Sequence, residues 1–178
     1  MNKLLVMVLF LLLIGTYIFA QDSFSTIPNG FGKIILGISM EDAKKAISAD
    51  GNFNYRGDQD LSILKRPNES LIECRGYDFI DRAFFQFKED QLYSITILFN
   101  FELIDHYSLF TTLSKKYGPP NSLSPEQSLW ETEENSLVLE RPLQIKYLDK
   151  KIFQGIIGES DISQSYSELS RVQFLDQF

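Results

Sequence analysis

The stretch Arg82–Phe101, "RAFFQFKEDQLYSITILFNF", decides the fold because apolar and polar side chains alternate along it. Phe85 and Phe87 alternate with polar neighbours before the polar "KEDQ". After this segment the apolar positions are Tyr93, Ile95, Ile97, Phe99 and Phe101. A period of two residues is that of a β-strand, and aromatic and β-branched side chains fit a half-buried sheet surface. The stretch therefore predicts an antiparallel hairpin with one buried face.

On both sides of this hairpin the spacing of apolar residues becomes helical. Upstream, "SMEDAKKAISADG" has Ser39 as N-cap, Asp42 in the capping-box position and Gly51 after the last turn. Downstream, "ELIDHYSLFTTLSKKYG" has an apolar stripe at the spacing of one helix face, formed by Leu103, Tyr107, Phe110, Leu113 and Tyr117. We expect Gly118 to take the left-handed conformation that ends helices, and Pro119 to prevent continuation.

The rest of the chain has the pattern of short strands and a terminal helix. "SLWETEENSLVLERP" predicts two strands, with Trp130 as a core anchor, and "LQIKYL" predicts a third. A last helix is predicted from an N-cap at Ser160. This order predicts an α+β fold in which one antiparallel sheet is covered on one face by two or three helices. Each half holds a capped helix, a glycine and short strands, which suggests a degenerate tandem of helix-plus-strands units.

Residues 1–20 have the pattern of an export signal, because Lys3 precedes an apolar run that ends in "IFA". Ile18, near the end of this run, is larger than a signal peptidase prefers. The run of about 17 residues also approaches the length of a membrane span, so an uncleaved N-terminal anchor remains an alternative. Either version exports residues 21–178 as a single α+β domain to the periplasm or cell envelope. Membrane contact is then expected only through an uncleaved N-terminal segment.

Composition excludes some classes of partner and crosslink. The formal net charge is −7, and no cluster of basic residues is longer than two, so we expect no binding to nucleic acid. Cys74 is the only cysteine and cannot form a disulfide within the chain. We expect it to be a buried, inert thiol.

The sequence contains no recognisable catalytic constellation. His106 is the only histidine, and a zinc site would need further His or Cys ligands at close spacing. The contexts of Cys74, "IECRG", and of His106, "IDHYS", match no nucleophile signature. We therefore predict a protein that is not an enzyme and binds no metal or cofactor, with His106 at the surface. The alternative is an envelope enzyme that acts through the carboxylates of Asp58, Asp60 and Glu131.

Two loops supply candidate residues for contact with a partner protein. "SKKYGPPNS" is best explained as a helix end, followed by a stiff, exposed loop that contains Pro119, Pro120 and Asn121. Arg56 and Asp58 belong to the tripeptide Arg-Gly-Asp, which host adhesion receptors recognise. These five residues are the predicted partner-binding candidates.

Two segments carry a resemblance to known proteins. "FGKIILGISMEDAKKAI", and "FTTLSKKYGPP" followed by a Trp-led strand, resemble segments of small bacterial envelope α+β domains, among them the small lipoprotein of the barrel-assembly machinery. The chain departs from that family because it lacks the lipidated cysteine and is longer. What the resemblance implies is an α+β adaptor of the cell envelope.

The leading hypothesis is a non-catalytic envelope protein, involved in envelope assembly, that binds another envelope protein or a small apolar ligand. The binding surface is expected on the aromatic face of the sheet or in the grooves beside it. Besides the carboxylate enzyme, an eight-stranded outer-membrane barrel is an alternative, because the chain ends in an aromatic residue, Phe178, and is long enough.

Overall fold

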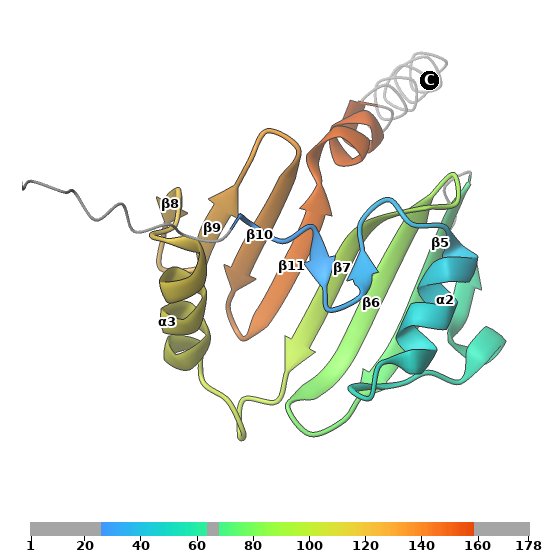
Figure 1. Ribbon diagram of the computed structural model, residues 1–178, viewed down its shortest axis with the longest axis horizontal. Coiled ribbons are helices and arrows are strands. Elements are labelled where there is room, and N and C mark those ends of the chain that lie inside the picture. The colour runs from blue at the N-terminus through green and yellow to red at the C-terminus, as the bar shows by residue number, and fades with distance from the viewer. Residues whose placement is uncertain (1–25, 64–67, 159–178) are drawn as a thin grey trace, which may run out of the picture.

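The computed structural model describes residues 26–63 and 68–158 (Figure 1). The predicted export segment 1–20 and the helix predicted from Ser160 lie outside the described residues. Among the helices of the described part, none is long and apolar enough to cross a bilayer.

The chain folds into two units of the same order, each a helix followed by three antiparallel strands. The first unit consists of α2 (Met40–Ala49), β5 (Glu69–Gly76), β6 (Ile80–Lys88) and β7 (Gln91–Phe99). The second consists of α3 (His106–Tyr117), β9 (Gln127–Glu131), β10 (Asn135–Glu140) and β11 (Gln144–Asp149). This repeated order is the tandem that the sequence suggested.

Short elements complete the fold. A small separate sheet pairs β1 (Gly30–Phe31) with β2 (Ile34–Ile35), and a 3₁₀ turn, η2 (Gly57–Asp60), precedes β4. The short strands of the main sheet are β3 (Phe53–Asn54), β4 (Leu61–Ile63) and β8 (Ser122–Leu123). A helix over residues 150–158 follows β11.

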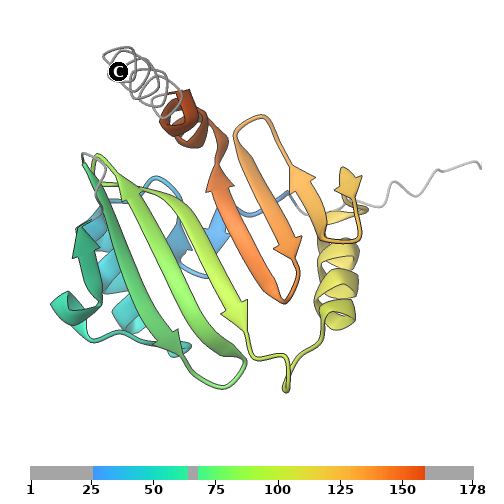
Figure 2. The same ribbon diagram turned by 180° about the vertical axis from the view of Figure 1, so that it is seen from behind.

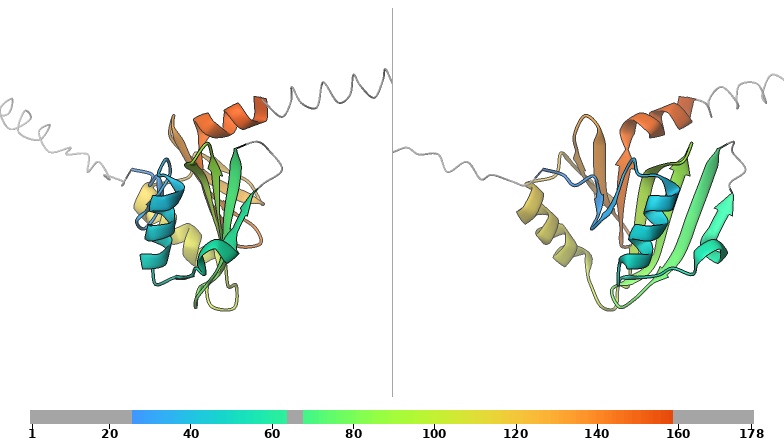
Figure 3. Two further views of the ribbon diagram at one scale, coloured as in Figure 1. Left: turned by 90° about the vertical axis from the view of Figure 1, so that its right-hand side faces the viewer. Right: turned by 45° about the vertical axis from the view of Figure 1, so that its right-hand side comes forward.

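The two units join through their last strands. The strands run in the order β3-β5-β6-β7-β11-β10-β9-β8, with β4 paired to β5. β7 and β11 pair antiparallel, with Ile95 opposite Tyr147 and Ile97 opposite Ile145. Equivalent strands that pair antiparallel are related by a two-fold axis through the sheet, so α2 and α3 lie on the same face (Figures 1 and 3). Among the described strands β3 and β8 do not pair with each other, and the sheet is open.

The predicted hairpin is formed by β6 and β7. Its two turn residues, Glu89 and Asp90, have φ angles of 50° and 65°, as a two-residue type I′ turn requires. The Asp90 carboxylate also accepts a hydrogen bond from Met40 N at 3.1 Å, which ties the turn to the start of α2. Phe101 departs from the prediction, because β7 ends at Phe99 and Phe101 is 75% exposed in the following loop.

The helix-covered face of the sheet is the core. Its fully buried side chains include Ile72, Phe85, Ile95, Ile97, Leu137, Leu139 and Trp130. α2 buries Ala43 and Ile47 against this layer, and α3 buries Leu113. The expected aromatic binding face is therefore inside the molecule, and the α+β class with helices on one face is confirmed. Figure 2 shows the opposite face, which neither α2 nor α3 covers.

Local hydrogen bonds make α3 shorter than the sequence pattern predicts. The Asp105 carboxylate accepts from Ser108 N at 2.9 Å, so Asp105 is the N-cap and the helix begins at His106. The preceding turn is closed by Asn100 O, which accepts from the N–H groups of Leu103 and Ile104. Leu103 and Tyr107 are consequently exposed, and the predicted apolar stripe packs only from Phe110 onward.

The other end of α3 agrees with the prediction in part. Gly118 has φ 83° and ψ −175°, so its φ is positive but its ψ is extended. Pro119 explains the difference, because its ring excludes helical ψ at the preceding residue. Trp130 is 1% exposed, and its indole N–H donates to Gly118 O at 2.9 Å. Trp130 is thus the predicted core anchor and also binds the end of α3.

Candidate ligand-binding groove

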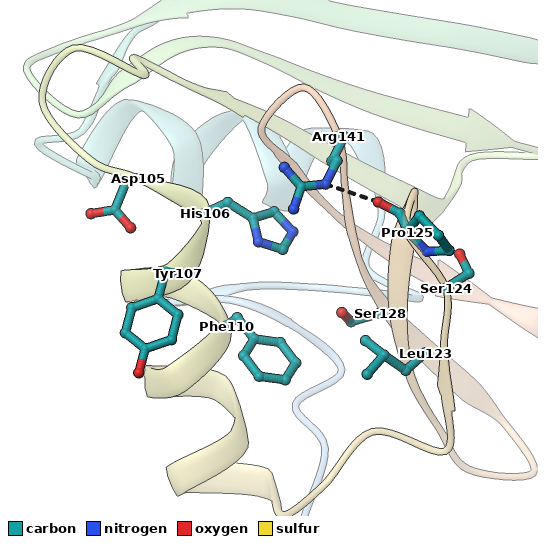
Figure 4. A pocket seen from close by; sticks show the side chains of 9 residues that line it. All are labelled: Asp105, His106, Tyr107, Phe110, Leu123, Ser124, Pro125, Ser128 and Arg141. Atoms are coloured by element: carbon teal, nitrogen blue, oxygen red, sulfur yellow. Dashed lines mark hydrogen bonds between the residues drawn. The ribbon is translucent and has the colours of Figure 1, made fainter.

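A groove lies between the first half of α3 and the loop that joins β8 to β9. Its volume is about 720 Å³, within the range of small-molecule sites. Figure 4 shows the side chains that line it, which are Asp105, His106, Tyr107, Phe110, Leu123, Ser124, Pro125, Ser128 and Arg141. They come from three separate parts of the second unit.

The inner wall of the groove is apolar. Phe110, on α3, lines one side of the groove, and Leu123 and Pro125 line the opposite side (Figure 4). Phe110 also contacts Trp130, with 6.2 Å between ring centroids, so this wall rests on the core. Leu123 is 65% exposed and lines the groove together with Phe110 and Pro125. The groove therefore offers apolar surface that an apolar ligand would remove from water.

One end of the groove carries Arg141 and His106, which point toward each other in Figure 4. Arg141 Nε donates to Pro125 O at 2.9 Å, and Arg141 N donates to Glu126 O at 2.9 Å. No carboxylate of the described residues forms an ion pair with this guanidinium. Its two Nη groups are therefore held in place and are available to an anion.

The charges around His106 keep its imidazole neutral. Burial lowers the pKa of His106, and the positive charge of Arg141 lowers it further, while Asp105 acts in the opposite direction. Asp105 itself is ionised, because hydrogen bonds from Ser108 N and Ser108 Oγ lower the pKa of its carboxyl group. At neutral pH the residues that line the groove thus include one cation, Arg141, one anion, Asp105, and a neutral histidine.

The groove lacks the contacts that covalent catalysis needs. A serine or cysteine nucleophile must hydrogen-bond to a base, and in the described structure no side chain hydrogen-bonds to the His106 imidazole. Cys74 lies on β5 in the other unit, and burial raises the pKa of its thiol to about 12. It is the buried, inert thiol that the sequence predicts. Within residues 26–63 and 68–158, no three metal-binding side chains cluster together.

The model of one protein family, the TP0088 domain, matches residues 29–159. The chain belongs to this family. The matched residues include both units and the groove between α3 and β9. No curated protein and no solved structure matches the chain. The description of the TP0088 domain names no activity, and the resemblance to the small lipoprotein of the barrel-assembly machinery stays a prediction.

In this TP0088 domain the predicted loop Pro119–Asn121 lies at the opposite end of α3 from the groove. Pro119 is exposed, but Asn121 has a structural role. Asn121 N donates to Leu129 O and its side-chain oxygen accepts from Glu131 N, both at 2.8 Å. These bonds hold the start of β8 against β9. The loop remains a candidate surface for a partner and contributes nothing to the groove.

The Arg-Gly-Asp tripeptide is folded onto a neighbouring carboxylate. Arg56 Nε donates to Asp60 Oδ1 at 2.9 Å, and Arg56 N donates to Asp60 Oδ2 at 2.8 Å. Asp60 is buried, so this pair closes the turn around η2. The Asp58 side chain is 91% exposed, with Lys44 Nζ at 3.8 Å. Arg56 is thus bound to Asp60 although its side chain is 61% exposed, and the exposed Asp58 lies within ion-pair distance of Lys44.

The three carboxylates of the enzyme alternative do not converge. Asp58 and Asp60 lie in η2, beside the β5 end of the sheet, whereas Glu131 lies on β9 and pairs with Lys150 at 2.7 Å. Four strands separate β5 from β9, at about 4.8 Å between neighbouring strands. These side chains therefore cannot act on one substrate atom in a common pocket.

Sequence reasoning missed most of the groove. His106 was noted but expected to be an ordinary surface residue, and Leu123 and Arg141 carried no signal. One clue was available: the apolar stripe continues to Tyr107 and Leu103, next to a strong N-cap residue at Asp105. Apolar residues at such a boundary lie where a helix leaves its packing surface.

Proposed function

We propose that this protein is a non-catalytic, exported domain of the bacterial cell envelope that binds a small apolar ligand in the groove between α3 and the β8–β9 loop. The observation that carries the proposal is the apolar wall formed by Phe110, Leu123 and Pro125 in a groove of about 720 Å³. Burial of apolar surface contributes about 25 cal/mol per Å², so an apolar ligand that lies along this wall gains substantial binding energy.

The hydrogen bonding of the β8–β9 loop supports a small ligand rather than an added strand of a partner protein. A partner strand would need free backbone groups at the sheet edge. Here Ser124 N donates to Gln127 O and Asn121 N donates to Leu129 O, both at 2.8 Å. β8 therefore occupies the edge of β9 beside the groove, and β8, the edge strand, offers only the 2 residues Ser122–Leu123 to an added strand.

Two further features support the rest of the proposal. The export signal in residues 1–20 directs the domain to the envelope. The absence of a nucleophile hydrogen-bonded to His106 among the described residues favours binding without chemistry.

Titration with N-phenyl-1-naphthylamine, a neutral fluorescent probe, tests whether the groove binds apolar molecules. We expect saturable binding by the parent protein and at least about tenfold weaker binding by Leu123→Asp, because the charge replaces apolar contact area with a hydrated group. The matched control is Ile157→Asp, a similarly exposed aliphatic residue at 44% that does not line the groove. Equal losses in both variants, or no saturable binding by the parent, would contradict the proposal.

A further inference from the structure

We infer that the ligand of the groove is a fatty carboxylate, whose head is bound jointly by Arg141 and His106 and whose alkyl chain lies along Phe110 and Leu123. This inference rests on the proposed function and adds the chemical class of the ligand. It follows from the direction of the guanidinium, the position of the imidazole and the apolar wall beside them.

Arg141 is arranged to receive a carboxylate. The bonds from its Nε to Pro125 O and from its backbone N to Glu126 O fix it against the β8–β9 loop. Its remaining guanidinium edge faces the groove without a described anionic partner (Figure 4). A planar carboxylate fits such an edge with two parallel hydrogen bonds, the strongest common arrangement for this pair.

His106 lies across from Arg141 and supplies a second donor when it is protonated. The charged groups that face it are Arg141, from the β10–β11 turn, and Asp105, from its own helix. β8 contributes Leu123, and the β8–β9 loop contributes Ser124 and Pro125; none of these side chains titrates in the physiological range. An anion placed between Arg141 and His106 would offset the Arg141 charge and favour the imidazolium. Binding of the head group is therefore expected to take up a proton.

The rest of the groove favours an alkyl chain over a peptide. Besides Arg141 and His106, its polar side chains are Asp105, Tyr107, Ser124 and Ser128. Asp105 accepts hydrogen bonds from Ser108 N and Oγ, and the side chains of Asp105 and Tyr107 point away from Arg141 (Figure 4). Ser124 Oγ already accepts from the N–H groups of Glu126 and Gln127, at 3.3 and 3.2 Å. A peptide would bring backbone polar groups at every residue, and each one buried without a partner costs binding energy. An alkyl chain has one polar end and meets one polar end in the groove.

The first experiment is calorimetric titration of the full-length gene product, purified after export, with decanoate and with neutral 1-decanol at pH 7.5. We expect decanoate to bind at least about tenfold more tightly than decanol. Arg141→Gln should remove that preference and leave decanol binding unchanged, and Arg141→Lys should restore only part of it. Thermal unfolding of each variant confirms that the fold is intact.

The outcomes separate the two proposals. If decanol binds and decanoate binds no better, the fatty-carboxylate inference fails while the groove remains an apolar site. If neither binds, the proposed function fails as well. An equal loss of decanol and decanoate binding in a folded Arg141→Gln variant would also overturn the inference, since Arg141 would then shape the groove rather than bind the head.

A second experiment tests His106 with decyl sulfate, whose head stays ionised throughout the range. Burial and Arg141 lower the pKa of the His106 imidazole in the free protein. A bound anion should raise this pKa, so the affinity should increase as pH falls through the pKa of the complex. We expect roughly fivefold tighter binding at pH 5.5 than at pH 7.5, with proton uptake seen in buffers of different ionisation enthalpy. His106→Gln should abolish the pH dependence. If the affinity of the parent protein does not depend on pH, His106 does not bind the head group.

Discussion

The two units share one order of elements, but their helices are seated differently. α2 is tied to the hairpin at its start, where Gly37 N donates to Leu92 O at 2.7 Å and Leu92 N donates to Ile38 O at 3.0 Å. The small β1–β2 sheet lies beside it over the middle of the main sheet (Figures 1 and 3). The first half of α3 has no comparable cover, and the groove opens there. The same architecture thus gives a covered core in one unit and an open groove in the other.

In a repeated fold of this kind, a surface groove can form beside the helix that is packed against the core at one end only. The end of α3 is held to the core by Trp130, which is 1% exposed and donates to Gly118 O. Its first residues are fixed by the Asp105 N-cap, and packing against the core begins at Leu109 and Phe110. A helix anchored at one end can present side chains to a ligand at the other end without loss of the fold.

The largest expected effect comes from removing the anchor of α3. Trp130→Ala should lower the free energy of unfolding by about 3–5 kcal/mol, because it leaves a cavity and an unpaired Gly118 carbonyl. Urea denaturation of the parent protein and the variant measures this difference in unfolding free energy. The matched groove variant Leu123→Ala should change stability by less than about 0.5 kcal/mol, since Leu123 is mostly exposed. If the two variants lose similar stability, the groove wall is part of the core.

An intermediate effect is expected from the glycines that follow the two helices. Gly118→Ala should cost about 1–3 kcal/mol of unfolding free energy, because φ 83° with extended ψ is nearly exclusive to glycine. Gly51→Ala should be nearly neutral, since Gly51 is outside the positive-φ region and has open space around its Cα. Thermal and chemical denaturation of both variants compares the units directly. Equal costs would mean that the helices end in the same way.

The smallest expected effect concerns the N-cap of α3. The lowered pKa of Asp105 means that its ionised form stabilises the folded state. This contribution is fully present above the unfolded pKa of about 3.9 and disappears as pH falls through the lower folded value. Asp105→Asn retains an N-cap acceptor, so the parent should be slightly more stable at pH 6 and equal to the variant at pH 2. A difference that persists at pH 2 would show that charge is not the cause.

Much of the fold could be predicted because its determinants are local. Alternation over Arg82–Phe101 predicted the hairpin, and cap residues predicted both helices. The start of α3 was misplaced because a single Asp105 side chain outweighed four residues of favourable spacing. The aromatic face was assigned to a partner although α2 and α3 cover it, since periodicity shows that a face is buried but not what buries it.

The groove could not be predicted, because its parts are distant in the sequence. His106 and Phe110 come from α3, Leu123 from the edge strand β8, and Arg141 from the turn after β10. None belongs to a motif, and the orientation of Arg141 depends on a bond to Pro125 O, sixteen residues earlier in the chain.

By itself the sequence determined the class of the fold, the central hairpin, the N-cap of α2, the buried cysteine and the expectation of export, because periodicity, capping and charge act over a few neighbouring residues. Only the tertiary structure decided which face is covered, where α3 leaves the core, and that a cation and a histidine meet beside an apolar wall. These features depend on contacts between residues distant in the chain: the pairing of β7 with β11 sets Ile95 opposite Tyr147, 52 positions later, and the groove brings together α3, β8 and the turn after β10.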